Sequence, residues 1–487
     1  MAQQDRKEHL LSGRFWFPEA SDNVVPGRLD LTGLYPRVEL FGSLSSFMEE
    51  RPSTAPGVTV FGPAEPSGSR TLHGALMGPV EAVTIFNAGQ IRHTANLLTI
   101  TSPTPNSGLQ EETFEGSYAV LGTHVADMDA VFTGIRFRIR YQDQWAHHTG
   151  LSVTWNQTGG EWKFEYTEPT AISAPLVGLS GNLTLEASAT ISPPRITGAY
   201  IDTTTWLRVE TAEGLKIHEA WRRFPVATSA LLTLLFDVKC PPVAFEVQDP
   251  ETKRWCEVVM PDLARDVANT GSTKRDQAVL INRLDLGLDR LAAWLDAAER
   301  LTPLPHIVAG TVEASDRTVP NRLLELAIAA EGVHRKLYPD ARRLTEQQVH
   351  DALAVLGKSG MEREAREALC TAMKLYLWEP SYPQRLEALA ADVSVAVPGV
   401  TGNTTKWRNA IRDVRVGSAH ALETGAITTD VLYGYSTLEK SLRWLLTGRL
   451  LLELGVPADN LAEKFSIYER YQRFLRNAKR DLPTIYM

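Results

Sequence analysis

The stretch Gly134-Ile135-Arg136-Phe137-Arg138-Ile139-Arg140-Tyr141 decides the class of fold. Apolar and polar residues alternate along it, which is the period of a β-strand with one buried face and one wet face. Shorter runs with strand character follow the same rule, and Gly, Pro, Asn and Thr separate them. They are found at 37–41, 151–155, 162–166, 207–211, 243–247 and 255–260. These runs predict antiparallel strands in a β-rich domain over residues 1–265.

The period changes to that of an α-helix from about residue 276, where leucines recur every three or four positions up to Leu295. The segment 302–320 is rich in Pro, Thr and Gly and predicts a linker. Helical periods are found at 226–236, 320–337, 345–356, 361–377, 383–392, 403–415, 419–424, 429–454 and 460–480. We therefore expect a connecting helix and linker over 266–317 and an all-α domain over 318–487. The predicted fold class is α+β.

Composition limits the class of protein. A chain of 487 residues with 43% hydrophobic and 22% charged residues is ordinary for a soluble globular protein of two or three domains. The charged amino terminus lacks the apolar core of a secretory signal, and no stretch approaches the 18 apolar residues of a membrane span. The three cysteines lack the spacing of a zinc site or a disulfide framework. We expect a cytoplasmic protein without a membrane segment.

The hexapeptide Arg415-Val416-Gly417-Ser418-Ala419-His420 holds the candidate catalytic pair, Arg415 and His420. A histidine suits proton transfer because its ordinary pKa is about 6.5. An arginine stays charged and offers a planar fork of donors to phosphate oxygens, so it can offset charge that develops at phosphorus. Such a pair needs no metal and no cofactor.

The motif alone is weak evidence. With 37 Arg and 11 His in the chain, a pair at this spacing is expected about 0.8 times by chance. The alternative is a solvated helix end that carries a histidine. Residues five apart on a continuous helix also lie about 140° apart around its axis, so the hypothesis includes a bend at Gly417-Ser418. Residues 401–480 carry 13 Lys and Arg against 8 Asp and Glu, an excess that is compatible with RNA as the partner.

Four further residues are candidates for supporting roles. Glu331 and His334 lie one helical turn apart on one face, where they either face the Arg415 pocket or leave Glu331 as a surface ion pair with Arg335. Arg408 and Arg412 lie just upstream of the motif with Trp407. These three residues either support RNA by stacking or phosphate contact or form a helical face with solvated charges.

Three stretches resemble known families. Residues 323–335, Leu-Leu-Glu-Leu-Ala-Ile-Ala-Ala-Glu-Gly-Val-His-Arg, resemble the first-helix signature of the HEPN family, and Ala419-His420 matches its common Ala-His. Gly13-Arg14-Phe15-Trp16-Phe17-Pro18, with residues 25–29 and 39–44 after it, resembles the opening of the ApeA amino-terminal domain. That family joins this domain to a carboxy-terminal HEPN domain in anti-phage proteins.

The resemblance implies an abortive-infection effector, in which the amino-terminal domain restrains or senses and the HEPN domain cleaves RNA without a metal. It implies a phage protein as a possible trigger and a homo-oligomer, a dimer or larger, that pairs two motifs in one site. Arg415 would clamp phosphate, and His420 would act as general acid or base or orient the scissile group. Val416 departs from the polar residue that is common after the motif arginine. The alternative is therefore a catalytically inactive HEPN module that binds RNA or protein.

Overall fold

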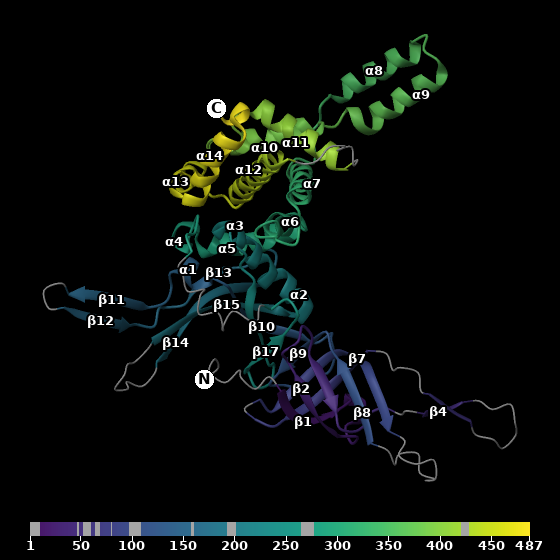
Figure 1. Ribbon diagram of the computed structural model, residues 1–487, viewed down its shortest axis with the longest axis vertical. Coiled ribbons are helices and arrows are strands. Elements are labelled where there is room, and N and C mark those ends of the chain that lie inside the picture. The colour runs from purple at the N-terminus through teal and green to yellow at the C-terminus, as the bar shows by residue number, and fades with distance from the viewer. Residues whose placement is uncertain are drawn as a thin grey trace. The chain divides into compact units, whose positions relative to one another are not determined.

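The computed structural model describes residues 10–45, 48–51, 60–63, 69–78, 80–96, 109–156, 160–191, 201–263, 277–419 and 428–487 (Figure 1). They belong to two compact units. The first comprises Met1–Val226 and Pro241–Arg275, and the second comprises Ala227–Cys240 and Asp276–Met487. The first unit is rich in strands and the second consists of helices. The predicted α+β class is confirmed.

The first unit contains the strands that the period of two predicted, including the stretch after Gly134, which forms β10. Its strands are β1 (Leu10–Trp16), β2 (Val25–Asp30), β3 (Arg37–Leu40), β4 (Met48–Arg51), β5 (Val60–Pro63), β6 (Arg70–Leu76), β7 (Ala82–Asn96), β8 (Leu109–Glu115), β9 (Tyr118–Leu121), β10 (Val131–Ile139), β11 (Leu151–Asn156), β12 (Glu161–Tyr166), β13 (Ile172–Pro175), β14 (Gly181–Ile191), β15 (Ile201–Lys216), β16 (Pro242–Gln248) and β17 (Trp255–Val259). Its helical elements are η1 (Pro18–Ala20), α1 (Gln142–Ala146), α2 (Ile217–Trp221) and the π-helical turn η2 (Arg222–Val226).

Six strands of the large sheet close on themselves in the order β6-β1-β2-β3-β8-β7. Closure depends on β7, whose 15 residues pair with β6 and β9 along the first half and with β8 along the second half. Phe15, Leu29, Val38, Ile85 and Phe114 from five of these strands are at most 1% exposed and belong to one apolar cluster. Burial of each such side chain stabilises the unit by about 1.5–3 kcal/mol.

The sheet continues from β7 in the order β9-β17-β16-β10-β15-β14-β13. On β10, Ile135 and Phe137 are fully buried on the face that α2 and η2 cover. On the other face the Arg136 guanidinium carbon lies 4.5 and 4.6 Å from the ring centroids of Trp206 and Trp255. The alternation in the sequence therefore separates an apolar core from a face of stacked cations and aromatic rings.

The second unit contains α3 (Ala227–Phe236), α4 (Arg283–Leu286), α5 (Leu288–Arg300), α6 (Leu304–Gly310), α7 (Val319–Leu337), α8 (Glu346–Lys358), α9 (Arg363–Ala372), the π-helical turn η4 (Met373–Leu377), α10 (Tyr382–Val393), α11 (Thr404–Ala419), α12 (Thr429–Glu453), α13 (Ala458–Ile467), α14 (Glu469–Asp481) and α15 (Pro483–Tyr486). Several details differ from the sequence-based expectation. The helix expected at 460–480 is divided into α13 and α14, and the helix expected at 419–424 lies outside the described residues except for its first residue. The segment predicted as a linker contains α6, because Pro305 lies in its first turn, where a missing N–H costs nothing. Helix α11 does not end at 415 but continues through Gly417 and Ser418.

Helices α7, α10, α11 and α12 pack against one another as a bundle, and α14 packs on α12. Trp444 of α12 is 2% exposed and makes edge-on contacts with Phe465, Tyr468 and Tyr471. Helices α8 and α9 form a hairpin that extends away from the bundle (Figure 1) and contain no buried residue. No helix in the described part of the chain has the length and hydropathy that crossing a membrane requires.

Candidate functional site

The motif arginine lies where three helices of the bundle meet. Arg415 is on α11, and its Nη2 donates a hydrogen bond of 2.8 Å to Oε2 of Glu331 on α7. Its guanidinium carbon lies 4.4 Å from the ring centroid of Tyr382 at the start of α10. The Arg415 side chain is still 33% exposed. A carboxylate and an aromatic face thus hold the guanidinium at a position that solvent reaches.

Glu331 connects Arg415 to a chain of alternating charges. Its Oε1 accepts from Arg335, one turn further along α7, at 3.2 Å. Arg335 donates to Oε2 of Glu379 at 2.7 Å, and the same oxygen accepts from Arg385 of α10 at 2.8 Å. The two possibilities for Glu331 are therefore both present, since it pairs with Arg335 and faces Arg415.

His334 lies at the far end of this chain and is 3% exposed. Arg385 Nη1 lies 3.1 Å from His334 Nδ1. An arginine can only donate, so Nδ1 accepts and the proton of the neutral ring is on Nε2. Burial, and then the positive charge of Arg385, lower the pKa of His334. His334 is a neutral member of the network that holds Arg385 in place.

The upstream arginines share one stripe of α11 with Arg415, because positions 408, 412 and 415 are spaced by four and three. Arg408 pairs with Glu387 of α10. Arg412 pairs with its neighbour Asp413 at 2.7 Å and is about half exposed. These contacts agree with a polar helical face that carries three cations.

Trp407 does not lie on that face. It is fully buried, and its indole N–H donates a 2.8 Å hydrogen bond to Ser441 Oγ of α12. A stacking contact between Trp407 and RNA is therefore wrong. The hydrophobic period of α11 directs this ring into the bundle.

His420 lies outside the described residues, so its contact with Arg415 stays a prediction. Helix α11 is described up to Ala419 and remains helical at Gly417 and Ser418, where we expected a bend. Val416, which follows the motif arginine, is 42% exposed. An apolar side chain thus borders Arg415 where a polar one was common in the resembling family.

Sequence reasoning missed Tyr382, Glu379 and Arg385. Tyr382 is 9% exposed, its buried hydroxyl has no hydrogen-bond partner in the described part of the chain, and burial raises its pKa above the usual range. A signal was present, because Ser381 and Gln384 form a capping box that fixes the start of α10 at Tyr382. The capping box predicts where the helix starts, but it does not predict that Tyr382 lies beside Arg415.

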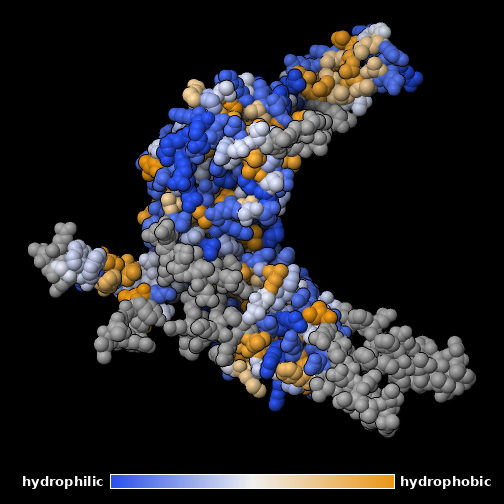
Figure 2. Space-filling model, in the orientation of Figure 1, coloured by the Kyte–Doolittle hydropathy of each residue, from blue (hydrophilic) through white to orange (hydrophobic). Residues whose placement is uncertain are grey.

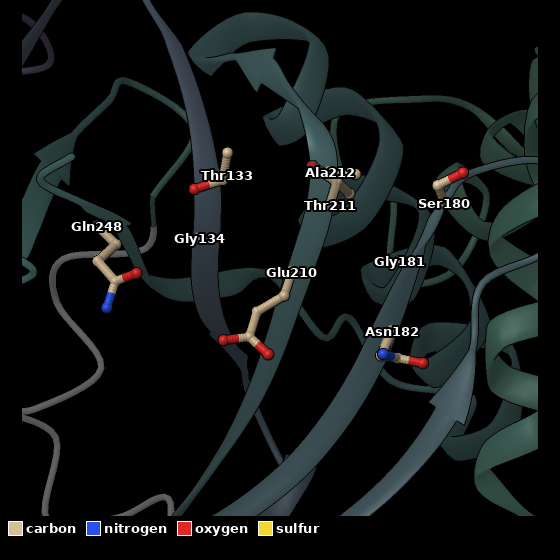
Figure 3. A pocket seen from close by; sticks show the side chains of 9 residues that line it. All are labelled: Thr133, Gly134, Ser180, Gly181, Asn182, Glu210, Thr211, Ala212 and Gln248. Carbon is tan, nitrogen blue, oxygen red and sulfur yellow. The ribbon is translucent and has the colours of Figure 1, made fainter.

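A shallow polar hollow of about 280 Å³ lies in the first unit, where β15 bulges away from β10 (Figure 3). Asn182 of β14, Glu210 of β15 and Gln248 of β16 line it, with Gly134 of β10 between the last two. It contains none of the predicted site residues. Among the residues that the structure describes, no group of three His, Cys, Asp or Glu side chains is placed to hold a metal ion.

A comparison with protein-family models matches the family described as ApeA N-terminal domain 1 over residues 11–296, which is more than half of the chain. The match covers the strands of the first unit and extends through most of α5. No curated protein and no solved structure matches the chain. The resemblance of the amino-terminal stretches is thereby confirmed, and the chain belongs to the ApeA N-terminal domain 1 family.

Proposed function

We propose that this protein is an anti-phage defence effector and that its helical unit is a metal-independent endoribonuclease of the HEPN type. Membership of the ApeA family supports the defence role. The nuclease proposal rests on the arrangement around Arg415, which Glu331 bonds and Tyr382 stacks against at the meeting point of α7, α10 and α11.

In the proposed reaction the 2′-oxygen of RNA attacks the adjacent phosphorus. The P–O5′ bond breaks, the 2′-hydroxyl loses its proton, and the 5′-oxygen gains one, so a 2′,3′-cyclic phosphate remains. Arg415 donates to the phosphate oxygens, where negative charge builds up in the transition state. His420 moves one of the protons or orients the scissile group.

The exposure of Arg415 supports this role, because a guanidinium has five N–H donors and the bond to Glu331 uses Nη2. Glu331 keeps Arg335 as a partner when a phosphate draws Arg415 away. Arg408 and Arg412, on the same stripe of α11, extend a cationic track along which an RNA backbone lies.

The finer parts of the proposal concern control. The ApeA domain restrains the nuclease or senses infection, with a phage protein as the trigger. The active form is a homo-oligomer, a dimer or larger, in which two motifs face one another across the interface.

The test is cleavage of total cellular RNA by the purified full chain in EDTA. Arg415→Ala and His420→Ala should abolish cleavage, and Arg415→Lys should retain only part of it because lysine lacks the planar fork. Arg473→Ala is the matched control, since it removes an exposed arginine with an i,i+4 acidic partner on α14. In cells, phage restriction should be lost with the same variants. Cleavage that EDTA abolishes, or that both motif variants retain, would contradict the proposal.

A second candidate function is an inactive module that binds RNA or protein, and the exposed Val416 beside Arg415 favours it. In that case wild-type protein binds RNA without forming product. Arg415→Ala then weakens binding and flattens its salt dependence, because one phosphate contact is lost.

A further inference from the structure

The strands β11 and β12 form a separate ribbon that extends from the large sheet of the first unit (Figure 1). Six residue pairs fix its register, among them Val153 opposite Phe164 and Trp155 opposite Trp162. Since paired residues share a face and faces alternate along a strand, these four side chains lie on one face. The base of the ribbon requires Gly150, whose φ is +66° and where a Cβ would lie 2.2 Å from the carbonyl oxygen of Thr167.

This aromatic face is open to solvent. Val153, Trp155, Trp162 and Phe164 are 42–61% exposed. The rings of Trp155 and Trp162 lie 4.7 Å apart between centroids, and those of Trp162 and Phe164 lie 6.4 Å apart. Figure 2 shows apolar residues gathered over the ribbon. A two-stranded ribbon with one bare apolar face is marginal in water, so a cover for this face stabilises it.

The opposite face is polar, and the two strands differ in charge. Lys163 and Glu165 of β12 are charged, and Lys163 pairs with Glu165 at 2.5 Å. On β11 the same face carries the uncharged Ser152 and Thr154, which lie opposite Glu165 and Lys163. Charges protect an edge strand against pairing with another chain. The edge of β11 lacks that protection.

The size of the face decides which occupant fits. The four apolar side chains expose about 450 Å² in all, judged from the area that such side chains bury. A stable dimer buries about 800 Å² on each partner, so two ribbons packed face to face fall short. An extended segment gains main-chain hydrogen bonds in addition to apolar contact, which lets a small patch hold it.

We propose that the β11 edge of this ribbon binds an extended segment of another protein by strand addition. The segment has alternating apolar side chains, which continue the aromatic face beyond Val153 and Trp155. Its intervening side chains are polar and lie beside Ser152 and Thr154. This interaction is separate from the proposed RNA chemistry, because none of its residues belongs to the Arg415 network.

The test is selection of a displayed library of random linear peptides on the full chain. Enriched peptides should alternate apolar and polar residues. A labelled selected peptide should bind Trp162→Ser about tenfold more weakly than wild type. Lys163→Ser, the neighbouring position on the other face, should bind it as wild type does. Backbone hydrogen exchange of 151–156 should slow more than that of 161–166 when peptide is added, and circular dichroism should show that both variants are folded.

Three outcomes would overturn the proposal. The first is a failure to enrich peptides, or enrichment of peptides without alternation. The second is equal affinity for wild type and Trp162→Ser. The third is conversion of an oligomer to a monomer by Trp162→Ser in light scattering, which would identify a second copy of this chain as the occupant.

Discussion

The pair of Arg415 and Glu331 should be the stronger of the two ion pairs that Glu331 makes, and a double-mutant cycle measures it. The changes are Glu331→Gln and Arg415→Gln, singly and together. Glutamine keeps the length and polarity of both sites but removes the charge. Arg335→Gln with Glu331→Gln provides an internal reference, because the same carboxylate accepts from both arginines.

The structure sets the size of the effect. Two opposite charges about 4 Å apart attract by about 4 kcal/mol at an effective dielectric constant of 20. Glu331 is 23% exposed and Arg415 33%, so solvent screening and desolvation remove more than half of this attraction, and a coupling of about 1–2 kcal/mol remains. Arg335 is 51% exposed and its bond is longer, 3.2 Å, which predicts a coupling of about 0.3–0.5 kcal/mol.

The assay is urea unfolding of the full chain, followed by the circular dichroism of the helices at neutral pH and low salt. The coupling of Glu331 with Arg415 should exceed that with Arg335 about threefold, and added salt should reduce the smaller coupling by the larger fraction. Equal couplings, or none between Glu331 and Arg415, would refute the view that Glu331 anchors the motif arginine.

Further predictions concern pH and packing. The pKa of His334 is lower in the folded protein than in the unfolded chain, so the unfolded chain takes up a proton there at a higher pH. Stability should therefore fall as pH drops below about 6.5. His334→Asn should reduce this pH dependence in urea unfolding at successive pH values. Tyr382→Phe removes a buried hydroxyl that has no hydrogen-bond partner among the described residues and should raise the free energy of unfolding by up to about 1 kcal/mol; a decrease would indicate a partner elsewhere in the chain. Gly448→Ala on α12 would bring a Cβ within 2.3 Å of Val397 Cγ2 and should cost about 1–3 kcal/mol. Gly357→Ala on α8 would place a Cβ with no neighbouring atom of the described residues within 4 Å and should stabilise by about 0.5–1 kcal/mol, as thermal unfolding of the two variants would reveal.

The fold class followed from local periods, because a strand with one wet face and an amphipathic helix each leave a direct mark on the sequence. β10 is the clearest example, with Ile135 and Phe137 inside and Arg136 outside. The closure of the sheet did not follow, since it depends on β7 pairing with different partners along its two halves. Which strands pair is set by contacts far apart in the sequence, and a period carries no information on them.

The candidate site shows the same limit. Arg415 and Glu331 could be named from local motifs, but their hydrogen bond joins residues 84 positions apart. The role of Trp407 stayed open because a tryptophan beside arginines looks the same in a sequence whether it points to solvent or to Ser441. Tyr382 was missed because an aromatic residue at the start of a helix is common. Its importance arises only from the packing of α10 against α11.

Arg385 and Arg415, the arginines at the two ends of the network, differ in exposure and in how far their partners depend on them. Arg385 is 4% exposed and donates both to Glu379 and to the buried His334. Loss of Arg385 would leave the buried Nδ1 of His334 without a hydrogen-bond donor, which would lower the free energy of unfolding. Arg415 is partly exposed, and its carboxylate partner Glu331 also pairs with Arg335. A phosphate can therefore replace Glu331 as the partner of Arg415, because Glu331 still keeps Arg335 as its counter-charge. The network therefore fixes Arg385 and leaves Arg415 exchangeable, which is the property that a phosphate-binding arginine needs.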